Sequence, residues 1–171
     1  MIDYKLVEAL LKQIKTGAFL TTKVENQFNT MTIGWMTLGQ VWNQDVVTVY
    51  VRLSRYTYDL IENSNHFTIS FPYPNKMLKE LKEWGEKSGR DINKLTMTNV
   101  SSTKSVDGVI IKDCYLHLEC EKIYDQKMDP GHLQPDLVQQ FYKDSEDYHH
   151  IYYGKIIDMY IEERLELFPG P

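Results

Sequence analysis

Two arginines and two hydroxyl side chains are concentrated in residues 51–57, where a β-branched run gives way to a short helical pattern. The chain has only four arginines, so Arg52 and Arg55 form a local positive charge in an acidic protein. Guanidinium groups pair with phosphate oxygens through forked N–H donors, and Ser54 and Thr57 add hydroxyl donors. The first N–H groups of a helix also favour an anion. The segment therefore indicates a phosphate site, although Ser54 could instead cap the helix beside solvated arginines.

A second segment, residues 29–35, alternates small polar side chains with large apolar ones. The small ones, Thr30, Thr32 and Gly34, share one face of an extended strand. Such a face would let a flat ring lie against the backbone, and a glycine in mid-strand often marks close approach by a ligand or another chain. The alternative is an ordinary half-buried strand with one solvated side.

Two further groups of residues could contact a ligand. An amphipathic helical pattern is followed by Ser88, Gly89 and Arg90, which could form hydrogen bonds to the edge of a ligand. The alternative is an ordinary helix C-terminus that ends at glycine. His149 and His150 form the only adjacent histidine pair. Their ordinary pKa lies near neutrality, so one could donate a proton, but on a strand they point to opposite faces and at most one can do so. A surface histidine beside a packed one is the alternative.

Motifs for other chemistries are missing from the sequence. Neither Gly-x-Ser-x-Gly nor His-Glu-x-x-His occurs, so no catalytic residue is identified and no metal site is expected. Gly-x-Gly-x-x-Gly does not occur either, so a separate Rossmann site for a nicotinamide nucleotide is not expected.

The elements that would position these residues are mainly strands. The hydrophobic patterns predict helices over 3–15, 56–63 and 75–87, and strands over 18–24, 30–38, 46–51, 66–71, 109–111, 115–123 and 151–161. Because strict βαβ alternation is absent, the fold class expected is mainly β with attached helices, in the form of an antiparallel barrel. We expect a single domain over 1–164, with a polar excursion at 125–148 and a loose tail at 165–171.

Composition excludes several classes of partner. The 171 residues carry a formal net charge of −5 and no long basic run, which argues against nucleic acid. No apolar stretch approaches 18 residues, and the N-terminus lacks the features of a secretory signal, so neither a membrane span nor secretion is expected. Cys114 and Cys120 would lie about 20 Å apart on one strand, too far for a disulfide, which fits a reducing cytoplasm.

Five segments, taken in order, resemble the flavin reductase-like family of FMN-binding split β-barrels, with flavoredoxins among its members. Together they span roughly residues 16–160. They are Asn-Thr-Met-Thr-Ile-Gly-Trp at 29–35, Val-Arg-Leu-Ser-Arg-Tyr-Thr at 51–57, Asn-His-Phe-Thr-Ile-Ser-Phe-Pro at 65–72, Ser-Gly-Arg-Asp-Ile-Asn-Lys-Leu at 88–95, and His-Ile-Tyr-Tyr-Gly-Lys-Ile at 150–156. No single segment is decisive, and the order of all five carries the resemblance.

The resemblance implies specific roles in binding FMN. The phosphate would be held by Arg52, Ser54, Arg55 and Thr57. The isoalloxazine ring would be lined by Asn29, Thr30, Met31 and Thr32. The site would be closed by Ser88, Gly89 and Arg90, either of the same subunit or of the partner in a homodimer. Trp35 would pack in the core, at the dimer interface or against the flavin.

The resemblance also implies an oxidoreductase that transfers hydride from NADH or NADPH through bound FMN to a flavin or another small acceptor. A flavoredoxin-like electron carrier is the alternative, and a flavin-free barrel is a third possibility. Two positions depart from the family pattern, Asn93 in place of Asp and Leu95 in place of Phe. The excursion at 125–148 is longer than the usual link, and either covers the flavin or decorates the surface.

Overall fold

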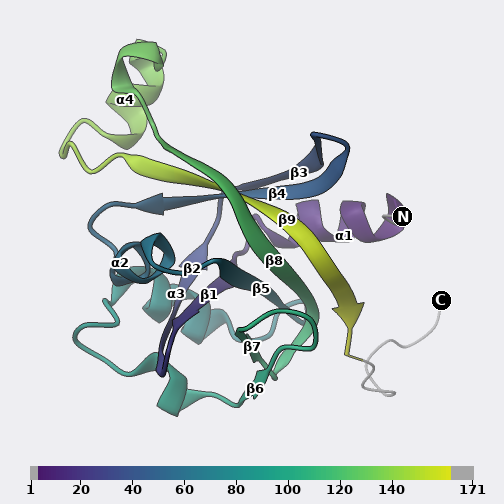
Figure 1. Cartoon of the computed structure of the whole chain (residues 1–171). Helices are drawn as coiled ribbons and strands as arrows, with labels where there is room; N and C mark the ends of the chain where they lie inside the picture. Colours follow the sequence, from purple (N-terminus) through teal and green to yellow (C-terminus); the bar gives the residue numbers. More distant parts are fainter. Residues whose placement is uncertain (1–3, 163–171) are drawn as a thin grey trace.

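The computed structural model describes residues 4–162, which form one curled antiparallel sheet with helices attached to it (Figure 1). The sheet has seven strands in the order β2-β1-β5-β8-β9-β4-β3. Their bounds are Ala18–Val24 (β1), Gln27–Ile33 (β2), Met36–Val41 (β3), Gln44–Arg52 (β4), His66–Pro72 (β5), Cys114–Lys127 (β8) and His149–Ile161 (β9). The expected class, mainly β with an antiparallel split-barrel arrangement, is confirmed.

The strand expected over residues 30–38 is in fact two strands. β2 ends at Ile33 and β3 begins at Met36, and these two strands are the opposite edges of the sheet. The chain therefore crosses from one edge to the other at Gly34 and Trp35. No ladder pairs β2 with β3 among the described residues, so the barrel stays split at this point. Alternating hydrophobicity predicts a strand but not which edge it joins, which is why the break was missed.

The helices lie around the sheet and are shorter than their sequence patterns. They are α1 (Tyr4–Gln13), α2 (Tyr56–Glu62), α3 (Leu78–Glu86) and α4 (Pro135–Phe141), with 3-10 turns η1 (Lys94–Met97) and η2 (Pro130–His132). Gly17 follows α1 with φ of +121°, a conformation that favours glycine and ends the helix. Residues 75–77, expected to be helical, form a turn instead, since Asn75 and Met77 have φ of 61° and 53°.

The main core fills the inside of the curled sheet. It joins side chains from all of the long strands, including Leu20, Val49, Phe67, Leu118 and Tyr152, all buried. A smaller cluster lies under α3, where Trp84 packs against Phe19 with ring centroids 4.9 Å apart. The strands β6 (Val100–Ser102) and β7 (Val109–Ile111) form a separate two-stranded ribbon over this cluster. Two packed regions thus fix the strands that carry the candidate site.

The excursion begins slightly later than its expected start at residue 125. β8 continues to Lys127, and residues 128–148 then form η2 and α4 before β9 begins at His149. In Figure 1 this segment stands away from the body of the sheet at the upper left. Its return places α4 and the following loop beside Trp35, the end of β4 and the start of β9, as the contacts below show.

Some expectations concern parts of the chain beyond these elements. The predicted loose tail at 165–171 and the first residue of the helix predicted over 3–15 lie outside the described residues. Within residues 4–162, no helix has both the length and the apolar character needed to cross a bilayer. Cys114 and Cys120 are free, buried thiols on β8, and burial raises the pKa of each.

Candidate functional site

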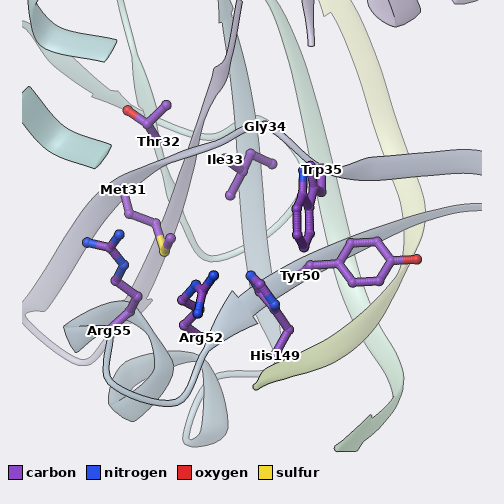
Figure 2. A pocket seen from close by; sticks show the side chains of 9 residues that line it. All are labelled: Met31, Thr32, Ile33, Gly34, Trp35, Tyr50, Arg52, Arg55 and His149. Atoms are coloured by element: carbon purple, nitrogen blue, oxygen red, sulfur yellow. The ribbon is translucent and has the colours of Figure 1, made fainter. Parts of the chain in front are cut away.

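A cavity of about 210 Å³ opens where the chain crosses from β2 to β3. Figure 2 shows Arg52, Arg55 and His149 pointing toward it from one side, with Met31 and Ile33 on the other and Trp35 and Tyr50 at one end. Its lining consists of Met31, Thr32, Ile33, Gly34, Trp35, Tyr50, Arg52, Arg55 and His149. The cavity therefore combines cations, aromatic rings and the backbone of a bend.

Strand register brings the two sides of this cavity together. Arg52 at the end of β4 pairs with His149 at the start of β9, so their side chains share one face of the sheet. Tyr50 lies two residues earlier on the same face, and its ring centroid is 6.5 Å from that of His149. Trp35 packs against His149 with centroids 4.8 Å apart. Residues almost 100 positions apart in sequence thus form one wall.

The charges at this wall are positive. Burial, with a smaller contribution from the positive charge of Arg52, lowers the pKa of His149 to about 4, while Asp147 acts in the opposite direction. His149 is therefore neutral at pH 7. Its Nδ1 lies 2.7 Å from the hydroxyl of Tyr142, which follows α4. A neutral imidazole held by a tyrosine at the edge of a cationic cavity can form a hydrogen bond with a bound ligand.

The four residues expected to hold a phosphate are placed differently from one another. Arg52 and Arg55 line the cavity. The guanidinium of Arg55 makes no hydrogen bond or ion pair with any described residue, whereas Arg52 donates to the carbonyl oxygens of Asp147 and Phe141. The Ser54 hydroxyl donates a hydrogen bond to the Asp147 carboxylate. Ser54 therefore does not cap α2, whose N-cap residue is Arg55. Thr57 is buried, and its hydroxyl accepts a hydrogen bond from Asn29 Nδ2 at 2.8 Å.

The residues expected to line a ring divide between the cavity and the packed interior. Met31 and Thr32 line the cavity. Thr30 is fully buried, and its hydroxyl donates to the carbonyl oxygen of Leu20 at 3.2 Å. The Thr32 hydroxyl donates to the carbonyl oxygen of Leu81 at 2.7 Å, so this side chain faces α3. The small polar face of the strand is therefore covered by protein, and only its end at Gly34 is open, with no atom within 4 Å of an added Cβ.

The loop expected to close the site lies beside a second cavity of about 300 Å³. Gly89 lines it together with Asn29 and Tyr56, and an added Cβ at Gly89 would come within 2.0 Å of Asn29 Oδ1. Only glycine permits this approach. Ser88 accepts a hydrogen bond from the Arg90 backbone N–H at 3.1 Å. Arg90 Nη1 donates to the Ser54 carbonyl oxygen at 3.1 Å, and its guanidinium also pairs with Asp59 and lies over the Tyr56 ring.

Sequence reasoning missed a third cation near the cavity. Lys94 is almost fully buried, and its ammonium donates to the Trp84 carbonyl oxygen at 3.0 Å. Burial, with a smaller contribution from the charge of Arg55, lowers the pKa of Lys94 to about 8. The group therefore carries most of its charge at pH 7. Its place in the 88–95 motif marked the residue, but nothing in the sequence indicated that it lies within electrostatic reach of Arg55.

The sequence also left several other residues that line the cavity without a definite role. Tyr50 and Ile33 were not singled out, Trp35 was assigned to three different environments, and either histidine of the adjacent pair remained possible. The strand register decides in favour of His149 as the one that lines the cavity. No local pattern reports such a register, because it depends on pairing between β4 and β9.

On the inner face of β9, His150 belongs to an acidic group. Its Nε2 lies 2.6 Å from Asp125 Oδ1, and Glu62 accepts a hydrogen bond from the Tyr152 hydroxyl at 2.7 Å. The ligand-type atoms of Glu62, Asp125 and His150 lie within 4.8 Å of one another. Side chains within the group already supply hydrogen-bond partners to both carboxylates. The group is therefore already hydrogen-bonded, except at His150 Nδ1, which is buried without a partner among the described residues.

The fold and the cavity together define the class of this protein: a split antiparallel barrel with an open, cation-lined pocket at the crossing between its edges. The chain belongs to the flavin reductase like domain family, whose model matches residues 13–168. The resemblance inferred from the five segments is therefore confirmed.

Solved structures with the same fold include flavin proteins. Flavoredoxin from Methanosarcina acetivorans is 26% identical, with a TM-score of 0.67 over 86% of this chain and 68% of its own. An FMN-binding protein from Thermus thermophilus with bound p-hydroxybenzaldehyde is 20% identical, with a TM-score of 0.67 over 91% of this chain and 76% of its own. NADH:FAD oxidoreductase from Streptomyces globisporus C-1027, in complex with NAD and FAD fragments, is 15% identical, with a TM-score of 0.62 over 95% and 86%. The last two share the fold alone. No curated protein sequence matches the chain.

Proposed function

We propose that this protein binds FMN and acts as an oxidoreductase that takes hydride from NADH or NADPH and passes electrons to a flavin or another small acceptor. One observation carries the proposal. A single cavity has a guanidinium without a hydrogen-bond partner among the described residues, that of Arg55, on one side and the Trp35 indole on the other (Figure 2). The first suits a phosphate monoester and the second a flat heterocycle.

The residues of the cavity fit the parts of FMN. Gly34 leaves open space where a side chain would stand, so a ring can approach the backbone there. Met31 and Thr32 supply the neighbouring backbone, and Arg55 supplies the principal charge for the phosphate, reinforced by Lys94. Asn29, Thr30 and Thr57 support this wall from within through the hydrogen bonds described above. Arg52 and Ser54 remain proposed phosphate ligands that must first exchange their present partners.

A bound flavin accepts hydride and releases electrons, while the protein supplies position and electrostatics. Arg52 and Arg55 favour negative charge in the cavity. Trp35 and Tyr50 exclude water from one end. With the Tyr142 hydroxyl donating to Nδ1, the neutral His149 ring carries its hydrogen on Nε2 and can donate a hydrogen bond from there to a ligand atom. We propose this histidine, rather than His150, as a hydrogen-bond donor to the ligand.

We also propose a homodimer in which a second copy completes the site. The cavity of about 210 Å³ is smaller than the roughly 300–1,000 Å³ typical of small-molecule sites. Apolar side chains stand exposed at its rim, with Trp35 39% and Phe141 38% accessible. A second protomer would cover these groups, and Ser88, Gly89 and Arg90 are the segment proposed to close over the flavin from either copy. Free buried thiols at Cys114 and Cys120 suit the cytoplasm as the compartment.

A flavoredoxin-like electron carrier is the second candidate function, and the 26% identity to the flavoredoxin from Methanosarcina acetivorans favours it. The two candidates share the cofactor and differ in the donor. A carrier receives electrons from a protein partner, whereas a reductase must admit a nicotinamide ring to the flavin.

The experiment is a spectroscopic titration of the purified protein. Absorbance in the flavin bands, or a spectral change on adding FMN to the apoprotein, is expected. Anaerobic addition of NADH and NADPH to the loaded protein should bleach these bands within seconds for a reductase. Bleaching only by a reduced partner protein would support the carrier. A colourless protein that ignores added FMN would overturn both and leave a flavin-free barrel.

A further inference from the structure

The carboxylate of Asp147 occupies donors of the proposed phosphate site. Its Oδ1 accepts the Ser54 backbone N–H at 3.0 Å, and its Oδ2 accepts the Ser54 hydroxyl at 2.6 Å. A backbone N–H and a hydroxyl that grip two oxygens of one anion form a donor pair that would serve a phosphate equally well. Asp147 lies in the loop after α4, some 90 residues along the chain from this junction.

The same loop also binds Arg52 and the backbone of Leu53, which lies between Arg52 and Ser54. Arg52 Nη1 donates to the Asp147 carbonyl oxygen at 2.9 Å, and Nη2 donates to that of Phe141 at 3.2 Å. The Leu53 N–H donates to the Tyr148 carbonyl oxygen at 3.3 Å. Two of the four phosphate residues inferred from the sequence are therefore held by residues 141–148, which we call the return loop.

The return loop also shapes the far end of the cavity. Phe141 packs edge-on against Trp35 with ring centroids 5.2 Å apart, and Tyr142 contacts His149. The return loop therefore contacts the anion donors Arg52 and Ser54 at one end of the cavity and the aromatic rings at the other. Displacing Asp147 from Ser54 would loosen both sets of contacts.

Charge makes this contact sensitive to an entering anion. Arg52, Arg55 and Asp147 all act electrostatically on His149, so these charges lie in one neighbourhood. A phosphate beside Arg55 would meet the negative charge of Asp147, and like charges at close range repel each other. The carboxylate and the phosphate would compete for the same cations and for the same two donors of Ser54.

We infer that Asp147 is an internal competitor for the flavin phosphate and a specificity-determining residue of the site. Phosphate binding displaces its carboxylate from Ser54 and frees the return loop from the junction. The inference rests on the proposed flavin function. It makes the affinity for FMN lower than the donor set alone would provide, and it leaves riboflavin, which has no phosphate, unaffected.

The test compares FMN with riboflavin by fluorescence quenching in wild type, Asp147→Asn and a control, Asp144→Asn. Asp144 is an exposed acid in the same loop with no contact to Ser54. Asp147→Asn should bind FMN about tenfold tighter, because a like charge is removed. Riboflavin affinity should stay within about twofold, and the control should match wild type for both ligands. Adding Ser54→Ala to Asp147→Asn should abolish part of the gain.

Amide hydrogen exchange of the wild type provides a second measurement that needs no substitution. FMN should speed exchange in residues 141–148 relative to riboflavin, because only FMN displaces the carboxylate. Equal exchange with both ligands, or an Asp147→Asn variant with unchanged or weaker FMN affinity, would overturn the inference and leave Asp147 as a simple tether. Wild-type protein that binds neither flavin would overturn the proposed function and this inference with it.

Discussion

The two faces of β9 carry neighbouring histidines in opposite surroundings. His149 lies among Arg52, Arg55 and aromatic rings at an open cavity. His150 lies on the inner face, bonded to Asp125 and stacked on Tyr152 with ring centroids 4.6 Å apart. One peptide unit thus separates a basic, ligand-accessible surface from an acidic, packed one. The comparison teaches that a histidine's role here is decided by the face it occupies and by the partners that the register supplies.

The largest expected effect comes from overfilling the packed face. A Cβ at Gly154 would lie 2.3 Å from Phe67 Cζ and 2.9 Å from Cys120 Cβ. Since Phe67 is itself buried, Gly154→Ala should lower the free energy of unfolding by about 3 kcal/mol or more. Thermal unfolding should then shift down by roughly 6–12 °C.

The matched control is Gly39→Ala on the exposed edge strand β3, where an added Cβ meets no atom within 4 Å. We expect its midpoint to be equal to or slightly above that of wild type, because Gly39 lacks positive φ and alanine restricts the unfolded chain. Similar losses in both variants would show that the inner face of β9 is less tightly packed than the distances indicate.

The second effect separates the two faces by charge. Arg55→Ala should weaken FMN binding by about 1.5–3 kcal/mol, the range for hydrogen bonds to charged groups. Riboflavin affinity should barely change. Asp125→Asn, which alters charge on the His150 face, should leave the ratio of FMN to riboflavin affinity near that of wild type. Isothermal titration with both ligands measures these ratios, and a parallel loss of both ligands in Arg55→Ala would place the phosphate elsewhere.

The smallest effect, taken per pH unit, is a pH dependence of stability. The pKa of His149 is about 4 in the folded protein, against about 6.5 in an unfolded chain. Between these values the unfolded state binds more protons, so the free energy of unfolding is fully retained above pH 6.5 and falls as pH drops toward 4. The slope is at most about 1.4 kcal/mol per pH unit for this residue. Buried His117, whose pKa is also lowered to about 4 by burial, adds an equal slope.

Urea unfolding of wild type and His149→Gln at several pH values measures this contribution. The variant should show a shallower fall in stability between pH 6.5 and 4, whatever its stability at pH 7. Identical slopes in the two proteins would mean that His149 is solvated enough to titrate normally, and the comparison between the faces would then rest on packing alone.

The sequence determined most of the elements and the family. The β-branched run before Arg52, the strand-like residues 18–24 and the alternation in 66–71 predict strands that the structure contains, because such patterns are local and need no knowledge of partners. The five ordered segments identified the family that the domain model matches. The cation pair at Arg52 and Arg55 was also visible, since it depends only on neighbouring residues.

Only the tertiary structure decided how these parts are joined. It split the predicted 30–38 strand between opposite edges of the sheet, chose His149 over its neighbour, and placed Asp147 on Ser54 across some 90 residues of chain. Each depends on strand order, on register, or on the path of a long loop. Those are set by the sum of many long-range contacts, which a local pattern of side chains does not encode.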